Sequence, residues 1–168
     1  MSAKSNLVLI GMPGAGKSTV GVVLAKKLGY AFVDSDLVIQ EKEKRLLHEI
    51  ISKEGLSGFL EIENRINASL DLERSVIATG GSVVYGTDAM EHLRQIGTVI
   101  YLKLSYAAIA NRLGDLHERG VALKEDQTLA GLYEERIPLY EHYADVTVDC
   151  ENLQLREVVE QIMKKLNL

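Results

Sequence analysis

Cysteine, proline and long apolar runs are scarce in this chain of 168 residues. The single cysteine, Cys150, cannot form a disulfide within the chain, and it excludes a cysteine-rich metal site. Only two prolines occur, and no repeat or low-complexity tract is visible. No apolar stretch is long enough to cross a membrane, and the first residues do not resemble a signal peptide. We therefore expect a cytoplasmic protein without a membrane partner.

Acidic residues outnumber basic ones, which gives a net charge of −5 at neutral pH. This balance argues against nucleic acid or an anionic membrane as the main partner. The apolar fraction of 46% and the charged fraction of 26% are ordinary for a globular protein. A chain of this length can bury a core of its own, so we expect a single domain over residues 1–168.

A phosphate-binding loop is the most specific motif of the chain. The segment Gly11–Thr19 fits the pattern G-x-x-x-x-G-K-[ST], follows the apolar run Leu7–Ile10 and precedes a helical pattern. Its glycines let backbone N–H groups turn toward the phosphates of a nucleotide, and the following helix adds its positive end. Lys17 is expected to reach the outer phosphates, and the Ser18 hydroxyl to bind Mg²⁺. The residues expected to hold the nucleotide are Gly14, Ala15, Gly16, Lys17, Ser18 and Thr19.

Strand-like and helical patterns alternate along the chain. We expect strands over Leu7–Ile10, Ala31–Val33, Ser75–Ala78, Thr98–Leu102 and Asp145–Val148. We expect helices over Ser18–Leu28, Asp36–Lys44, Leu46–Lys53, Ser57–Leu72 (with Ser57 as N-cap), Thr87–Gln95, Tyr106–Arg112, Thr128–His142 and Leu153–Leu166. This alternation is typical of a parallel sheet with helices on both faces, a three-layer α/β/α fold. Ligands of such folds bind at the carboxyl ends of the strands.

Two acidic residues, Asp34 and Asp36, follow the second expected strand. One carboxylate can hold Mg²⁺ through water, together with Ser18, and the other can accept the proton of a hydroxyl that attacks the γ-phosphate. The third strand ends without an acidic residue, so Asp34 is the better metal candidate. The alternative for Asp36 is a plain helix N-cap.

Two further segments are expected to lie at the same edge of the sheet. Thr79–Ser82 contains Gly80 and Gly81, whose exposed N–H groups can contact a ligand, unless the segment is an ordinary turn. The polar stretch 113–127 has no clear period and resembles a lid between two helices. Arg119 in that stretch is expected to close over the phosphates and stabilise the transferring group.

Several blocks match one known family in order along the chain: Gly11–Thr19, Asp34–Asp36, Gly58-Phe59 with Glu63, Ala78–Gly81, Arg136–Tyr140, Ala144-Asp145 and Val148-Asp149. With these blocks the chain resembles the shikimate kinase family over nearly its whole length, more than gluconate kinases or nucleoside monophosphate kinases. The resemblance implies a five-stranded sheet in the order 2-3-1-4-5. It also implies a substrate-binding region near 34–72, a lid near 112–126, and the use of ATP and Mg²⁺ to phosphorylate a hydroxyl group.

The resemblance also implies roles for single residues. Asp36 would hold and deprotonate the hydroxyl of a small-molecule substrate, and Gly80 and Gly81 would contact that substrate. Arg136 would bind an anionic group, and Arg112 would lie against adenine. The oligomeric state stays open, with a monomer slightly favoured.

The chain departs from the family pattern at three places. The family pattern F-R-x-x-E has an arginine that binds the substrate carboxylate together with the arginine corresponding to Arg136, and here that position is Leu60. The third glycine of the family is Ser82, and the lid pattern R-P-L-L begins at Arg119 but continues differently. A hydrogen bond to a charged group contributes about 1.5–3 kcal/mol, so its loss weakens binding about 10- to 150-fold. We therefore hypothesise that the substrate differs from shikimate.

Glu63 suggests what that substrate carries. The resemblance implies that this glutamate normally lies beside the arginine that Leu60 replaces. Without it, Glu63 is free to bind an amino group of the substrate, such as that of a hydroxylated amino acid or an amino alcohol. The alternative is an ion pair of Glu63 with Arg65 or another surface cation. Two other classes stay open: a nucleotide-binding regulator without transfer activity, and a relative of nucleotide or gluconate kinases, against which the Arg136–Tyr140 block argues.

Overall fold

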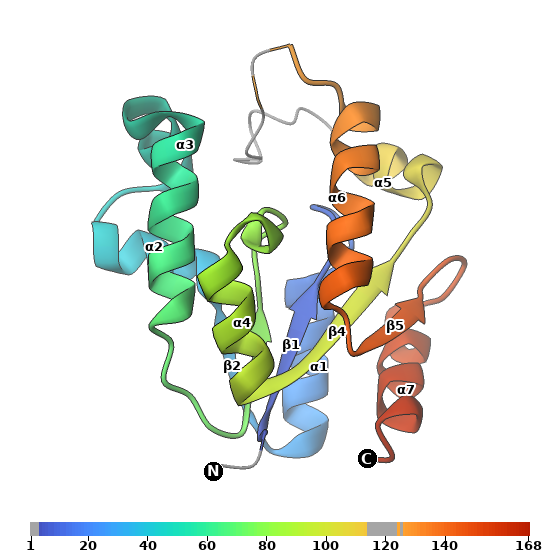
Figure 1. The fold of residues 1–168 in the computed structure, drawn as a ribbon. Helices are drawn as coiled ribbons and strands as arrows, with labels where there is room; N and C mark the ends of the chain where they lie inside the picture. The colour runs from blue at the N-terminus through green and yellow to red at the C-terminus, as the bar shows by residue number, and fades with distance from the viewer. Residues whose placement is uncertain (1–3, 114–123, 125) are drawn as a thin grey trace.

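The computed structural model describes residues 4–113, 124 and 126–168. Its centre is a five-stranded parallel sheet in the order β2-β3-β1-β4-β5 (Figure 1), which confirms the expected order. The strands are β1 (Asn6–Ile10), β2 (Ala31–Asp34), β3 (Ser75–Ala78), β4 (Gly97–Lys103) and β5 (Val146–Asp149). Each expected strand is present within two residues of its expected bounds.

The burial of each strand agrees with its central or edge position in the sheet. All residues of the neighbouring strands β1 and β3 are buried, as continuous apolar runs in a sheet covered on both faces require. The edge strands β2 and β5 are only partly buried. In the centre, Leu7 of β1 pairs with Val76 of β3 and with Thr98 of β4, so the strand ends are aligned at one edge.

Helices cover both faces of the sheet. Helices α1 (Lys17–Leu28) and α7 (Leu155–Lys165) contact each other on one face, and α4 (Thr87–Ile96) and α6 (Leu129–Tyr143) pack on β4 from the other (Figure 1). The short helix α5 (Tyr106–Arg112) packs against α6. In the described part of the chain, no helix combines the length and the apolar character that crossing a membrane requires.

Helices α2 (Ser35–Glu43) and α3 (Leu47–Ala68) stand together beside the β2 edge (Figure 1). Their apolar side chains form a second, smaller core of Ile39, Ile50, Phe59 and Ile66, and the partly buried Leu60 packs against it. This core is separate from the main core around the sheet. Helices α2 and α3 therefore pack against each other through a core of their own, beside the site described below.

Helix α3 corrects one expectation. α3 consists of two helical segments that meet at a non-helical kink at Gly55 (φ 76°), so the two helices expected over Leu46–Lys53 and Ser57–Leu72 are both present, and only the expected cap and end of the second are wrong. A glycine reaches this left-handed region without steric cost, so the chain bends there and resumes its helical course. Ser57 therefore lies inside the helix and is not its N-cap, and the helix ends at Ala68, short of the expected Leu72.

Candidate active site

The loop between β1 and α1 has the backbone geometry of a phosphate-binding loop. Gly14 and Gly16 have φ values of 84° and 90°, a region that other residues rarely adopt. Gly16 is the N-cap of α1 and has no side chain to cap the helix. The free N–H groups and the positive end of α1 therefore face the space above the loop, where an anion is favoured.

Lys17 is buried inside this loop. Its Nζ donates hydrogen bonds to the carbonyl oxygens of Gly11 (2.6 Å) and Met12 (2.9 Å). Burial lowers the pKa of Lys17 to about 8, against the opposing charge of Asp36. The loop carbonyls thus hold the ammonium group at the base of the cavity, where bound phosphates would favour its charged form.

Asp34 joins the loop to the start of α2. One carboxylate oxygen accepts the Ser18 hydroxyl (3.0 Å), and the other accepts the backbone N–H of Asp36 (3.0 Å). Asp34 is therefore the N-cap of α2, which corrects the alternative that Asp36 has this role. A hydroxyl and a carboxylate held together beside a phosphate loop match the few protein ligands that Mg²⁺ takes alongside phosphates.

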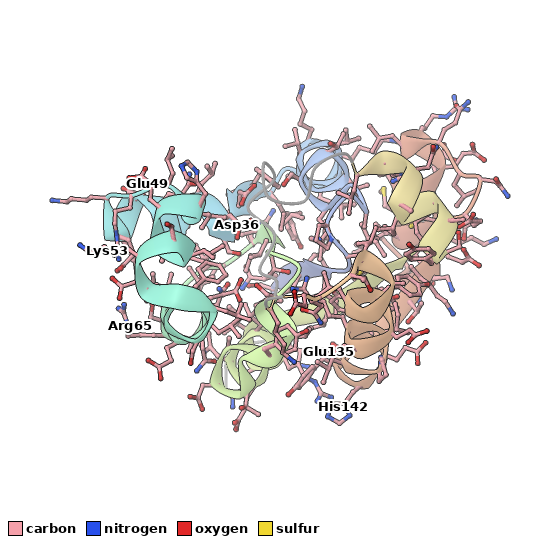
Figure 2. All side chains as sticks on the ribbon, turned by 90° about the horizontal axis from the view of Figure 1, so that it is seen from above. Asp36, Glu49, Lys53, Arg65, Glu135 and His142 are labelled. Carbon is pink, nitrogen blue, oxygen red and sulfur yellow. The ribbon has the colours of Figure 1, made fainter. Side chains whose placement is uncertain are left out.

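Asp36 lies in the first turn of α2 and lines the cavity above the loop. Figure 2, a view from above, shows it toward the middle of the molecule, whereas Arg65 lies at the periphery. Partial burial raises the pKa of Asp36 to about 6, with a further increase from Asp34 and an opposing effect of Lys17. At neutral pH the group is an ionised base that is easier to protonate than an ordinary aspartate.

The segment after β3 forms the facing wall. A Cβ on Gly80 would stand 2.6 Å from Oδ1 of Asp36 and 3.1 Å from Oε2 of Glu63, so only glycine fits between the two carboxyl groups. Ser82 donates a hydrogen bond to Oε1 of Glu63 (2.7 Å). Burial raises the pKa of Glu63 to about 8, although the Ser82 bond and the charge of Arg136 oppose this effect. Two carboxyl groups with different affinities for a proton therefore share one wall.

Arg136 reaches the cavity from α6 and is 1% exposed. Its Nε donates to the hydroxyl of Tyr85 (3.3 Å), and its guanidinium lies 5.3 Å from the centre of the Tyr85 ring. Tyr85 belongs to η1 (Val83–Tyr85), and its hydroxyl donates to Glu135 (2.7 Å). A Cβ on Gly81 would stand 2.9 Å from Nη1 of Arg136, so the cation lies against the glycine segment.

These groups surround one cavity of about 270 Å³. Its lining consists of Pro13, Gly14, Gly16, Lys17, Ser18, Thr19, Asp34, Asp36, Leu47, Phe59, Glu63, Thr79, Gly80, Gly81, Ser82 and Arg136. The structure thus brings together the predicted phosphate, metal and substrate residues, except Ala15 and Arg112. Leu60 is not in the lining, and Arg119 lies outside the described residues.

Arg112 and Ala15 line a second cavity of about 210 Å³ next to the loop. Nη1 of Arg112 donates to the carbonyl oxygen of Gly14 (3.1 Å), which ties α5 to the phosphate loop. The opposite wall comes from Leu153, Leu155 and Val158, after β5. This cavity has an apolar wall on one side and a cation at its rim, directly beside the phosphate-loop motif.

Sequence reasoning missed two contributions to the site. The hydroxyl of Tyr85 orients Arg136, and the apolar residues after β5 form the second cavity. The rule that ligands bind at the carboxyl ends of strands could have indicated the residues after β5. No sequence signal pairs Tyr85 with a residue 51 positions away.

A phosphate loop, a carboxylate base and a buried cation around one cavity define a P-loop kinase that transfers phosphate from ATP to a hydroxyl group of a small molecule. Comparison with known proteins narrows this class. The shikimate kinase family model matches residues 13–167. The chain is 40% identical to shikimate kinase of Thermodesulfovibrio yellowstonii, over 95% of this chain and 94% of that protein. It is 35% identical to shikimate kinase of Bacillus cytotoxicus, over 96% of this chain and 98% of that protein.

Solved structures agree with this result. Shikimate kinase from Acinetobacter baumannii in complex with shikimate superposes with a TM-score of 0.82 and 30% identity, over 97% of this chain and 93% of that one. The chain therefore belongs to the shikimate kinase family, whose members use ATP and Mg²⁺ to phosphorylate a hydroxyl group.

Proposed function

We propose that this kinase phosphorylates a small polar acceptor other than shikimate. The observation that carries the proposal is Leu60. Where the family pattern has a substrate-binding arginine, Leu60 packs into the small apolar core of α2 and α3 and does not line the cavity. Arg65 does not compensate, because its side chain is 66% exposed and pairs with Glu43 on the outer surface.

The nucleotide side keeps its full set of residues. The loop Gly14–Thr19 would cradle the phosphates, with Lys17 beside the transferred group. Ser18 and Asp34, which already share a hydrogen bond, would hold Mg²⁺, which when bound neutralises phosphate charge. The second cavity, with Arg112 at its rim, supports a place for the base.

On the acceptor side, Asp36 would accept the proton of the attacking hydroxyl. The hydroxyl oxygen then forms its bond to the γ-phosphorus as the bond to ADP breaks, and the proton stays on Asp36 until solvent removes it. Gly80 and Gly81 would let the acceptor approach closely, and Arg136 would bind an anionic group on it. Arg119, outside the described residues, keeps its predicted role in closing over the phosphates.

The test is ADP release from Mg·ATP with shikimate and with a panel of hydroxylated amino acids, amino alcohols and sugar acids. We expect poor turnover with shikimate and saturable turnover with another member of the panel. Leu60→Arg should raise kcat/KM for shikimate about 10- to 150-fold, because it restores a bond to the carboxylate. Leu60→Met is the matched control and should leave kcat/KM for shikimate unchanged. Efficient use of shikimate by the unmodified protein would overturn the proposal.

A further inference from the structure

One buried carboxylate oxygen in the cavity wall lacks a hydrogen-bond partner among the described residues. Glu63 is 2% exposed, and its Oε1 accepts the hydroxyl of Ser82. Its Oε2 has no hydrogen-bond partner among the described residues. A buried polar atom without a partner is costly, and native proteins rarely leave one unless a ligand or water binds there. Since Glu63 lines the cavity, the substrate is the natural partner.

The surroundings of this oxygen favour a cation. Oε2 of Glu63 and Oδ1 of Asp36 both approach Gly80, at 3.1 and 2.6 Å from the position of a Cβ there. A ligand group beside Gly80 meets two carboxyl groups: the ionised Asp36 attracts an ammonium group, and an ammonium group favours the ionised form of Glu63. The helix itself supplies no cation here, because Leu60 packs into the apolar core and Arg65 pairs with Glu43.

The other end of the same wall favours an anion. Arg136 is buried, always charged, and lies against Gly81, the residue next to Gly80. The cavity therefore presents a proton acceptor, a carboxyl pair and a guanidinium around one short glycine segment. A ligand that matches all three has a hydroxyl, an ammonium group and an acidic group.

We propose that the acceptor is a hydroxylated amino acid, whose ammonium group is bound by Oε2 of Glu63 and whose carboxylate is bound by Arg136. This proposal rests on the proposed kinase function and names the substrate class of that site. Ser82 is a positioning residue: its hydroxyl donates to Oε1 and so fixes the orientation of the Glu63 carboxyl in the cavity wall. A glycine at position 82, as in the family pattern, would leave the Glu63 carboxyl free to rotate.

The test compares matched acceptor pairs by ADP release from Mg·ATP. Serine, threonine and homoserine are each paired with the hydroxy acid in which a hydroxyl replaces the amino group, and shikimate and sugar acids are included. We expect at least one amino acid to exceed its partner in kcat/KM by about 10- to 150-fold, the value of one charged hydrogen bond. In Glu63→Gln that ratio should fall to near one. Glu61→Gln, at an exposed position of the same helix, is the matched control and should keep the ratio.

Ser82 needs a readout that a purely structural role would not change. Ser82→Gly should raise KM for the preferred amino acid more than it lowers kcat, and Ser82→Thr, which keeps the hydroxyl, should restore KM. Calorimetry in two buffers gives a measure independent of turnover. Because the pKa of Glu63 is about 8, binding of an ammonium ligand at pH 7 should release about one proton, and this release should vanish in Glu63→Gln.

Two outcomes would separate the proposals. Turnover of sugar acids or other hydroxy acids with no preference for any amino acid would overturn the inference and leave the kinase function intact. No ADP release with any acceptor, although ATP binds, would overturn the kinase function itself, and the inference with it.

Discussion

The cavity has a nucleotide half and an acceptor half. The first is formed mainly by one loop, and the second by side chains from several elements. The half proposed to bind the nucleotide is lined by the Gly14–Thr19 loop, with the buried Lys17 and the hydrogen-bonded Ser18–Asp34 pair. The acceptor half uses side chains from α2, α3, the segment after β3, and α6. The first half agrees with the family pattern, whereas the second departs from it at Leu60 and Ser82.

This difference indicates which half of the site can accept substitutions in a kinase of this fold. Phosphates are recognised by a loop conformation, which depends on glycines and on a helix start, so few substitutions are compatible with it. In the proposed function the acceptor is recognised by individual charges, so the exchange of the family arginine for Leu60 would change which acceptor binds.

Asp36→Asn should lower kcat about 10²- to 10⁴-fold, because it removes the base on the acceptor side.

The Asp36→Asn variant should also unfold with a larger free energy than the unmodified protein at neutral pH. The folded-state pKa of about 6 exceeds the ordinary aspartate value of 3.8, so ionised Asp36 destabilises the fold above pH 6, and this penalty is absent below pH 3.8. Since Asp36 stays partly open to solvent, we expect a gain of about 1–2 kcal/mol in the free energy of unfolding. Steady-state kinetics and thermal unfolding measure both effects, with the exposed Asp71→Asn as control.

Lys17→Met should lower kcat/KM about 10²- to 10³-fold by removing the cation beside the transferred phosphate. The factor should be the same for every acceptor tested, because Lys17 belongs to the nucleotide half. Lys26→Met, at an exposed position of the same helix, should have no effect. A loss that depends on the acceptor would break the division into two halves.

The pH profile of kcat/KM should fall about tenfold per unit below pH 6. Asp36 must be ionised to accept a proton, and its pKa is about 6, so protonation removes activity as the pH falls through that value. The residual activity of Asp36→Asn should lack this limb. An acid limb that persists in the variant would assign it to another group.

Tyr85→Phe should raise KM for the acceptor about 3- to 10-fold and leave KM for ATP unchanged. The substitution removes the hydroxyl that accepts from Nε of Arg136 and donates to Glu135, so the guanidinium loses its orientation while the ring remains beneath it. Initial rates at varied acceptor and varied ATP concentrations distinguish the two constants. An equal rise in both would show that Arg136 also serves the nucleotide half.

Arg112→Ala should raise KM for ATP about 2- to 5-fold, because an exposed cation at the rim of the second cavity contributes little. The selectivity among acceptors should not change. Arg156→Ala, which removes an exposed arginine from α7, is the control. A change in acceptor selectivity in Arg112→Ala would contradict the assignment of the second cavity to the base.

The elements that support the site could be predicted because their signals are local. The apolar run of β1, the glycine pattern of the loop and the periodicity of α1 each lie within a dozen residues, and the structure agrees with them. The Ser57 N-cap was wrong because the non-helical residue that separates the two helical segments of α3 is Gly55, two positions earlier. The η1 turn with Tyr85 was not predicted, since three residues carry no periodicity.

The class of chemistry could be read from the sequence, because a phosphate-loop motif and an aspartate pair follow strands whose carboxyl ends must meet at one edge. The arrangement of the acceptor wall depends on the packing of the folded chain. Ser82 bonds Glu63 across 19 positions, and Tyr85 bonds Arg136 across 51. Such pairs depend on the rotation of α3 and α6 against the sheet. That rotation is set by packing of whole elements, and no local pattern encodes it.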